Sequence, residues 1–169
     1  HFWCEPSLGK NIPQLSPLIG YIEDRDLWRF SLWESYAVTA WLRSYPRNFE
    51  IWDELHDNLN GNRWEVVSEG RAILRASEQV VASICDQAWL GTVSGFKKIP
   101  IVNTATLISE VGNALCARFP DSPFSATYYD REHTRTWSLR SIDFDVSQVA
   151  WNNGGGGHRN AAGFVSPLN

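Results

Sequence analysis

The sequence has 169 residues, of which 43% are hydrophobic and 20% are charged, and its net charge is −4. This balance is typical of a globular protein with a sizeable core, and it excludes a disordered or collagen-like chain. A negative net charge also argues against binding to duplex DNA through bulk positive charge. No apolar run approaches the roughly 20 residues that cross a bilayer, so no membrane partner is expected.

The positions of the charged residues and of the cysteines indicate which ligand and which cellular compartment to expect. The acidic excess lies in residues 1–84, whereas residues 85–169 are neutral, so a small anionic ligand held by a few placed groups remains open. The sequence contains no methionine, and we expect it to be part of a longer chain. A cytoplasmic, reducing location is predicted because the three cysteines form no CxxC pair, which disfavours a disulfide scaffold or a zinc site. They are Cys4, Cys85 and Cys116.

The N-terminal third predicts short helices separated by prolines. Apolar residues recur at helical spacing over residues 34–43 and again over residues 49–59. The tryptophans of this part are expected to pack together as core, and exposed rings that stack on nucleobases are the alternative. These tryptophans are Trp28, Trp33, Trp41 and Trp52.

Residues 64–88 carry the clearest periodic pattern, with apolar side chains every three to four positions. The pattern predicts a long amphipathic helix that connects a helical segment, residues 1–63, to a separate domain, residues 89–169. The turn residues Asn60-Gly61-Asn62 support a boundary before this helix.

From residue 89 the pattern changes to α+β. Strands rich in β-branched and aromatic residues alternate with amphipathic stretches, and turn residues separate them. The predicted elements are a hairpin over 89–103, a helix over 106–119, a second hairpin over 124–140 and a helix over 146–152 capped by Asp145. The expected fold class is therefore α/β of the α+β kind, with a small mixed sheet of about five strands flanked by helices.

Four consecutive glycines are the most informative feature of the sequence. They lose more backbone entropy on folding than other residues would, so such a run indicates close backbone approach or unusual dihedral angles. Successive glycine N–H groups can hold phosphate oxygens, a following histidine can donate to the same anion, and an arginine can add a charge-assisted contact. A flexible, purely structural loop is the alternative. The candidate residues are Gly154, Gly155, Gly156, Gly157, His158 and Arg140.

Two motifs at suitable spacing resemble a known family. SLRS at 138–141 and GGGGHRNAAGF at 154–164, with an Asp-Val-Ser helix start between them, resemble the DHH-associated C-terminal domain of DHH-family phosphoesterases. The resemblance covers residues 64–169. It implies that the four glycines and His158 grip substrate phosphate and that Arg140 supports them. It gives no role to Arg159 or Asn160, which lie at variable positions of the motif.

A second, shorter resemblance concerns residues 16–30, SPLIGYIEDRDLWRF. This segment is similar to the end of the DHH catalytic domain in the oligoribonuclease branch, where an aspartate completes a two-metal manganese site. The match implies a metal role for Asp24, with Asp26 second, and it makes residues 1–63 the C-terminal remnant of that domain. The earlier metal-binding motifs are absent from the sequence, and a solvated charge cluster is the alternative interpretation.

Together the two resemblances imply the substrate-binding portion of a metal-dependent phosphoesterase. The longer protein would use Mn²⁺ to act on short single-stranded oligonucleotides or related nucleotides, as a nanoRNase does. This chain would bind but not hydrolyse them without the missing DHH domain. The alternatives are a non-catalytic RNA- or nucleotide-binding module, since similar domains occur in alanyl-tRNA synthetases, and an interaction domain whose glycines are only structural.

Overall fold

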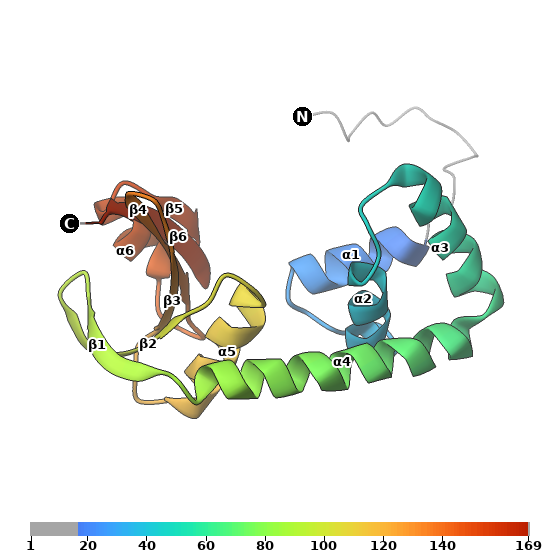
Figure 1. Cartoon of the computed structure of the whole chain (residues 1–169), viewed down its shortest axis with the longest axis horizontal. Helices are drawn as coiled ribbons and strands as arrows, with labels where there is room; N and C mark the ends of the chain where they lie inside the picture. Colours follow the sequence, from blue (N-terminus) through green and yellow to red (C-terminus); the bar gives the residue numbers. More distant parts are fainter. Residues whose placement is uncertain (1–16, 169) are drawn as a thin grey trace. The chain divides into compact units, whose positions relative to one another are not determined.

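The described part of the chain forms two compact units, which divide between residues 76 and 77, inside the long helix α4 (Arg63–Cys85) (Figure 1). The computed structural model describes residues 17–168. The first 16 residues of the predicted segment 1–63, Cys4 among them, lie outside the described residues. Within the described residues, no helix combines the length and the apolar character needed to cross a bilayer.

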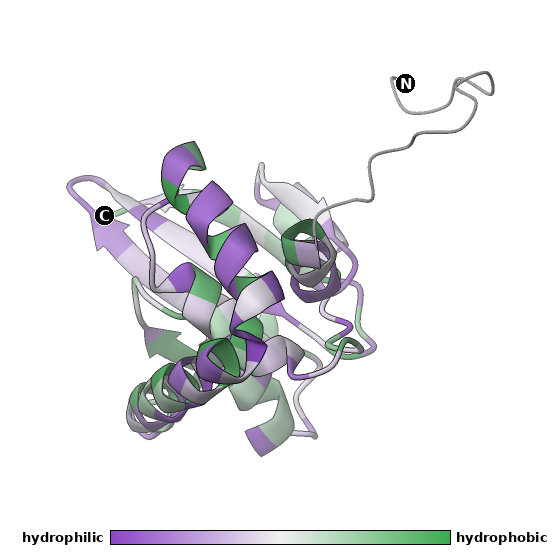
Figure 2. Ribbon diagram, turned by 90° about the vertical axis from the view of Figure 1, so that its right-hand side faces the viewer, coloured by the Kyte–Doolittle hydropathy of each residue, from purple (hydrophilic) through white to green (hydrophobic). Residues whose placement is uncertain are grey.

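The first unit is helical, as predicted. It contains α1 (Pro17–Asp26), α2 (Ser35–Arg43), α3 (Phe49–Gly61) and the start of α4. The amphipathic pattern of these helices appears as alternating apolar and polar residues in Figure 2. Their apolar sides form one core, with Leu18, Tyr21, Val38, Trp41, Leu55, Leu59 and Val67 among its buried residues. Gly70 of α4 permits a close helix contact, because a Cβ at this position would lie 2.1 Å from the carbonyl oxygen of Ala37 in α2.

The expectation that all four N-terminal tryptophans belong to the core was wrong for two of them. Trp41 is buried, with 2% of its surface exposed, and Trp52 is half-buried. Trp28 and Trp33, however, are 40% and 44% exposed. They lie in the connection between α1 and α2, where Trp28 itself has a φ of 54°. A helical period does not apply to such an irregular segment, so it could not identify the buried side.

The second unit is an α+β domain built on one six-stranded sheet, which agrees with the predicted fold class. Its strand order is β1-β2-β3-β4-β6-β5; β2 and β3 are parallel and the other neighbours are antiparallel. The elements are β1 (Trp89–Val93), β2 (Phe96–Asn103), α5 (Ile108–Arg118), β3 (Ser125–Arg131), β4 (Thr134–Arg140), α6 (Val146–Asn152), β5 (Gly156–His158) and β6 (Ala161–Pro167). The two predicted hairpins account for β1 to β4, and no local pattern predicts β5, which overlaps the glycine run, or β6 as individual strands.

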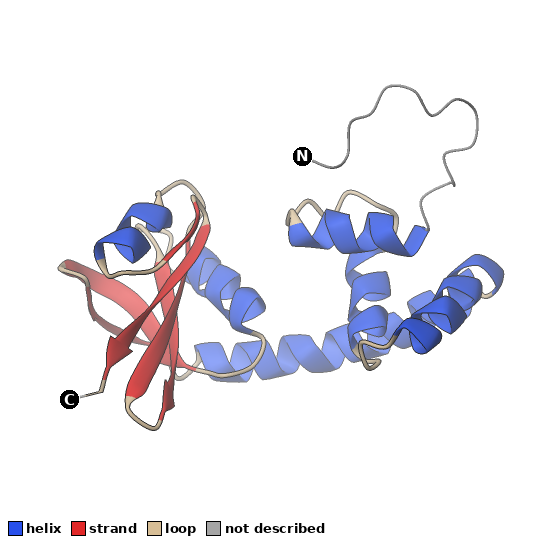
Figure 3. Cartoon of the chain, turned by 90° about the horizontal axis from the view of Figure 1, so that it is seen from above, coloured by secondary structure: helices blue, strands red, loops and turns tan. Residues whose placement is uncertain are grey.

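Helices cover both faces of this sheet (Figure 3). On one face, α6 packs on a core that includes Ile99, Ile101, Ala126, Leu139, Val149 and Ala162. On the other face, α5 and the C-terminal turns of α4 enclose Cys85, Val102, Val111 and Leu115. Strand β2 contributes to both cores through alternate residues, as expected for a strand buried on its two sides.

Candidate functional site

Strand register brings the predicted Arg140 and His158 onto one face and one end of the sheet. Arg140 pairs with Ala161 of the neighbouring strand β6, and Ala161 pairs with His158 of the edge strand β5. Directly paired residues of antiparallel strands share a face, so the three side chains form one row. Leu139 and Ala162 belong to the core under α6, which assigns the row to the opposite face, the side of α5.

A gap lies between Arg140 and His158, the side chains at the two ends of this row. Two interstrand spacings separate Arg140 from His158, which amounts to about 10 Å between their backbones. Ala161 lies between them and contributes only a methyl group. His158 is exposed, and within residues 17–168 its ring forms no hydrogen bond. The arrangement therefore offers donors on both sides of a small gap.

Arg140 is positioned by α5. Its Nη1 donates to the Leu139 carbonyl at 2.9 Å and its Nη2 donates to Ser109 Oγ at 2.8 Å. The aliphatic part passes close to Gly112, where a Cβ would lie 2.6 Å from Arg140 Cγ. Burial lowers the pKa of the guanidinium, while the nearby Glu110 carboxylate raises it. Arg140 still carries a full charge at neutral pH, and its remaining N–H groups can donate to a ligand.

The glycine run forms a turn and an edge strand, not a loop. Gly154 has a φ of 76° and follows the end of α6, a position where glycine adopts the left-handed conformation without strain. A Cβ on Gly155 would lie 2.1 Å from the Gly163 carbonyl oxygen, and one on Gly157 would lie 2.5 Å from Ala162 Cα. Only Gly156 is unconstrained, because a Cβ there would have no neighbour within 4 Å. Packing thus explains most of the run, and Gly156 is left unexplained by it.

Arg159 and Asn160, to which no role was assigned, join the turn after β5 to the segment that follows β4. Arg159 Nη2 donates to the Asp143 carbonyl at 2.9 Å. The Asn160 side-chain amide donates to the Ser141 carbonyl at 3.1 Å and also to that of Ile142. These bonds fix residues 141–143 at the same end of the sheet as the row.

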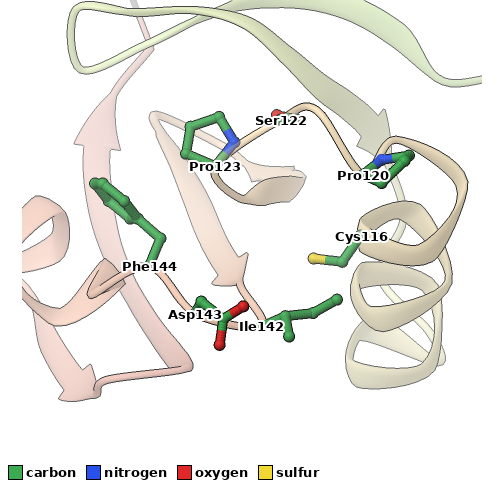
Figure 4. A pocket seen from close by; sticks show the side chains of 7 residues that line it. All are labelled: Cys116, Pro120, Ser122, Pro123, Ile142, Asp143 and Phe144. Carbon is green, nitrogen blue, oxygen red and sulfur yellow. The ribbon is translucent and has the colours of Figure 1, made fainter.

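A cavity of about 360 Å³ opens at this end of the sheet (Figure 4). Cys116 points from α5 toward the space between Pro123, Phe144 and Asp143. Its thiol also donates to the carbonyl oxygen of Arg140 at 3.1 Å, which connects the cavity to the row. Burial raises the pKa of this thiol. The lining residues are Cys116, Pro120, Ser122, Pro123, Ile142, Asp143 and Phe144.

No local pattern in the sequence predicts this cavity. Its walls come from α5, from the connection before β3 and from the connection after β4. Each part alone looks like an ordinary helix end or turn. Pro120 and Pro123 follow the predicted helix over 106–119 and locally indicate only its end, and Asp143 belongs to no recognisable motif.

Asp24, the predicted metal residue, lies in the first unit and is 5% exposed. Its Oδ1 accepts from the backbone N–H and the hydroxyl of Ser31 at 2.9 and 2.7 Å. Its Oδ2 accepts from the hydroxyl of Ser35 at 2.6 Å and from the N–H of Leu32 at 3.2 Å. Burial raises the pKa of this carboxyl, but the four hydrogen bonds outweigh it, and the pKa falls well below its usual range. The carboxylate thereby anchors the connection between α1 and α2.

The described residues do not supply a metal centre. Across residues 17–168, no three His, Cys, Asp or Glu side chains gather as metal ligands would. Asp24 already shares both oxygens with protein donors, and Asp26 is exposed at the end of α1. The Mn²⁺ expected for the longer protein remains a prediction.

Comparison with known proteins gives one sequence relative. No family model matches the chain. It is 27% identical over 166 residues to uncharacterized protein R106 of Acanthamoeba polyphaga mimivirus, an alignment that covers 92% of this chain and 38% of the relative. The chain therefore spans well under half of that protein.

Comparison of structures gives distant similarities. One is to a pGpG-specific phosphodiesterase, PggH, from Vibrio cholerae, with a TM-score of 0.48, 10% identity and coverage of 73% of this chain and 46% of that one. Another is to an exopolyphosphatase-related protein from Bacteroides fragilis, with a TM-score of 0.45, 12% identity and coverage of 86% and 49%. A third is to the DHH domain of a member of a family of ribosomal proteins, with a TM-score of 0.48, 14% identity and coverage of 94% and 43%. At these scores the similarities carry no conclusion about function.

Proposed function

We propose that this chain is the substrate-binding portion of a metal-dependent, DHH-type phosphoesterase that acts on short oligonucleotides or related nucleotides. The observation that carries the proposal is the row Arg140–Ala161–His158 beside the open edge strand β5. These residues belong to the two motifs, SLRS and GGGGHRNAAGF, on which the family resemblance rests. A substrate phosphate would lie over Ala161 and accept hydrogen bonds from Arg140 and His158, which flank it on the same face of the sheet.

Titration of a dinucleotide against the 169-residue chain tests the phosphate site. Removing one charge-assisted hydrogen bond costs about 1.5–3 kcal/mol, so His158→Ala should weaken binding about tenfold or more. Arg140→Lys keeps the charge but loses the planar fork, and it should also weaken binding. His133→Ala is the matched control, because His133 is exposed at the β3–β4 turn, away from the row. Equal affinity in all three variants would overturn the proposal.

The catalytic half of the proposal has its own test. The described residues hold no cluster of metal ligands, so the 169-residue chain with Mn²⁺ should not hydrolyse dinucleotides. Robust turnover by this chain alone, retained through chromatography, would contradict the assignment of the active site to a separate DHH domain.

One observation favours the alternative, a non-catalytic RNA-binding module. Trp28 and Trp33 are exposed in the first unit, and the guanidinium groups of Arg25 and Arg63 each lie 5.9 Å from one of their ring centroids. Aromatic rings with adjacent cations are a common surface for single-stranded nucleic acid. Loss of RNA pentamer binding in Trp33→Ala but not in Trp151→Ala, an exposed tryptophan of the second unit, would support this alternative.

A further inference from the structure

We propose that the cavity lined by Asp143, Phe144 and Pro123 is a base-binding subsite selective for guanine, an inference that rests on the proposed nucleotide-binding function. The cavity lies at the end of the sheet where Arg140 and His158 lie. Its volume of about 360 Å³ falls in the range of small-molecule sites and suits one planar base.

The walls of the cavity fit a flat aromatic ring. Pro123 and Phe144 present ring surfaces, and Ile142 adds an aliphatic side that is 65% exposed. The Phe144 ring packs against Phe96 and Phe124, whose ring centroids lie 5.4 and 5.6 Å away. Aromatic and apolar side chains of this kind enclose bases in many nucleotide sites. The apolar walls thus favour a base but do not select among the four.

The Asp143 carboxylate would select guanine from among the four bases. It is the single carboxylate among the lining residues, and no donor within the described part of the chain bonds to its side chain. An ionised carboxylate only accepts hydrogen bonds, and it can accept two parallel ones. Guanine presents two adjacent donors on its Watson–Crick edge, N1–H and the 2-amino group. Adenine and cytosine place an acceptor beside their single amino group, and uracil flanks its N–H with two carbonyl oxygens.

Hydrogen bonds from the neighbouring turn fix the segment that contains Asp143 before any base binds. The Arg159 guanidinium donates to the Asp143 carbonyl, and the Asn160 amide donates to those of Ser141 and Ile142. Both donors directly follow the GGGGH motif. The residues next to the phosphate-binding motif therefore position the base-binding wall, which gives Arg159 and Asn160 positioning roles.

The distance between the two subsites suits one nucleotide. Helix α5 contacts Arg140 twice: Ser109 Oγ accepts from its guanidinium, and Cys116 of the cavity donates to its carbonyl oxygen. Seven helical residues separate these contacts, which is roughly 10 Å along the helix axis. A phosphate near the guanidinium would leave the base of the same nucleotide within reach of the cavity.

Affinities of the 169-residue chain for GMP, IMP, AMP and CMP, measured by calorimetry, test the inference. We expect GMP to bind about tenfold or more tightly than AMP and CMP, and IMP, which lacks the 2-amino group, to fall between. Asp143→Asn should remove the preference for GMP. Asp121→Asn, which makes the same charge change at an exposed neighbouring position that does not line the cavity, should keep it.

The outcomes separate the two proposals. Equal affinity for the four nucleotides, or a GMP preference that survives Asp143→Asn, would overturn the guanine subsite while leaving phosphate binding intact. Failure of every nucleotide to bind, together with inorganic phosphate, would overturn the proposed function and the subsite with it. A thermal unfolding midpoint shared by Asp143→Asn and the wild-type chain identifies a loss of selectivity as local.

Discussion

Substitution of Gly156 by alanine separates the structural role of the glycine run from its role in binding. Gly156 lies two residues before His158 in β5, and it pairs with Gly163 of β6. Alternate residues of a strand share a face, so a methyl group at this position would lie on the same side as His158. A Cβ there has no neighbour within 4 Å. The added methyl group therefore meets nothing in the folded protein, but it would narrow the α5 face beside His158, where a nucleotide bound through its phosphate would extend along β5.

Gly156→Ala has opposite effects on the stability of the fold and on the affinity for nucleotide. Gly→Ala at a position without strain stabilises a protein by about 0.4–1 kcal/mol, because the unfolded chain loses conformational freedom. Displacing a phosphate from one charge-assisted hydrogen bond costs about 1.5–3 kcal/mol, or roughly ten- to a hundredfold in affinity. Gly156→Ala should thus be as stable as the wild type or slightly more stable, and it should bind nucleotide much more weakly.

The control is Gly157→Ala. Gly157 has a φ of 142°, and its Cβ would lie 2.5 Å from Ala162 Cα. Strain and overpacking together should cost about 2 kcal/mol or more, visible as a lower urea midpoint by circular dichroism. Undiminished nucleotide affinity in a stable Gly156→Ala variant would refute the reasoning. The glycine run would then be explained by packing alone, and the α5 face of β5 would not be a binding surface.

Three further outcomes follow from the packing and the titrating groups. Gly70→Ala should lower the unfolding midpoint of the first unit, because overpacking against the α2 backbone costs about 1–3 kcal/mol, whereas Gly61→Ala, with no neighbour within 4 Å, should not lower it. The pKa of Asp24 is lowered by folding, so its carboxylate stabilises the first unit above about pH 4 and this contribution is lost as the pH falls further; Asp24→Asn should flatten that part of an acid titration. Burial raises the pKa of the Cys85 and Cys116 thiols, so both should react slowly with iodoacetamide in the native protein and quickly in urea.

Local signals made much of the second unit predictable. The helix over residues 146–152 was expected with these bounds because Asp145 can cap it, and the Asp145 carboxylate indeed accepts from the N–H of Ser147 at 3.0 Å. The two hairpins were predictable from β-branched runs around short turns. Strand β5 was not, because glycine has a low β-propensity, and only pairing with β6 makes Gly156–His158 a strand.

The candidate site shows a different limit. Arg140 and His158 were each identified from motifs, but their shared face depends on β6 lying between β4 and β5, which no local pattern encodes. The cavity depends on the same topology, since its walls come from three separate segments. The two oxygens of Asp24 accept hydrogen bonds from Ser31, Leu32 and Ser35, which no local pattern in the sequence predicts, and the metal role that its motif implies stays a prediction.

The structure also makes the glycine run weaker evidence for phosphate binding than the sequence alone suggests. Gly154 serves the end of α6, and Gly155 and Gly157 permit close contact with β6. Three of the four glycines therefore have a structural reason that would hold in a protein without any ligand. The case for binding rests instead on residues that the packing does not require, which are Gly156 and His158. Both lie on the α5 face, in adjacent rows of the sheet, and the charged Arg140 lies in the row of His158. Variants at Gly156 and His158 can therefore alter ligand binding while leaving the fold intact.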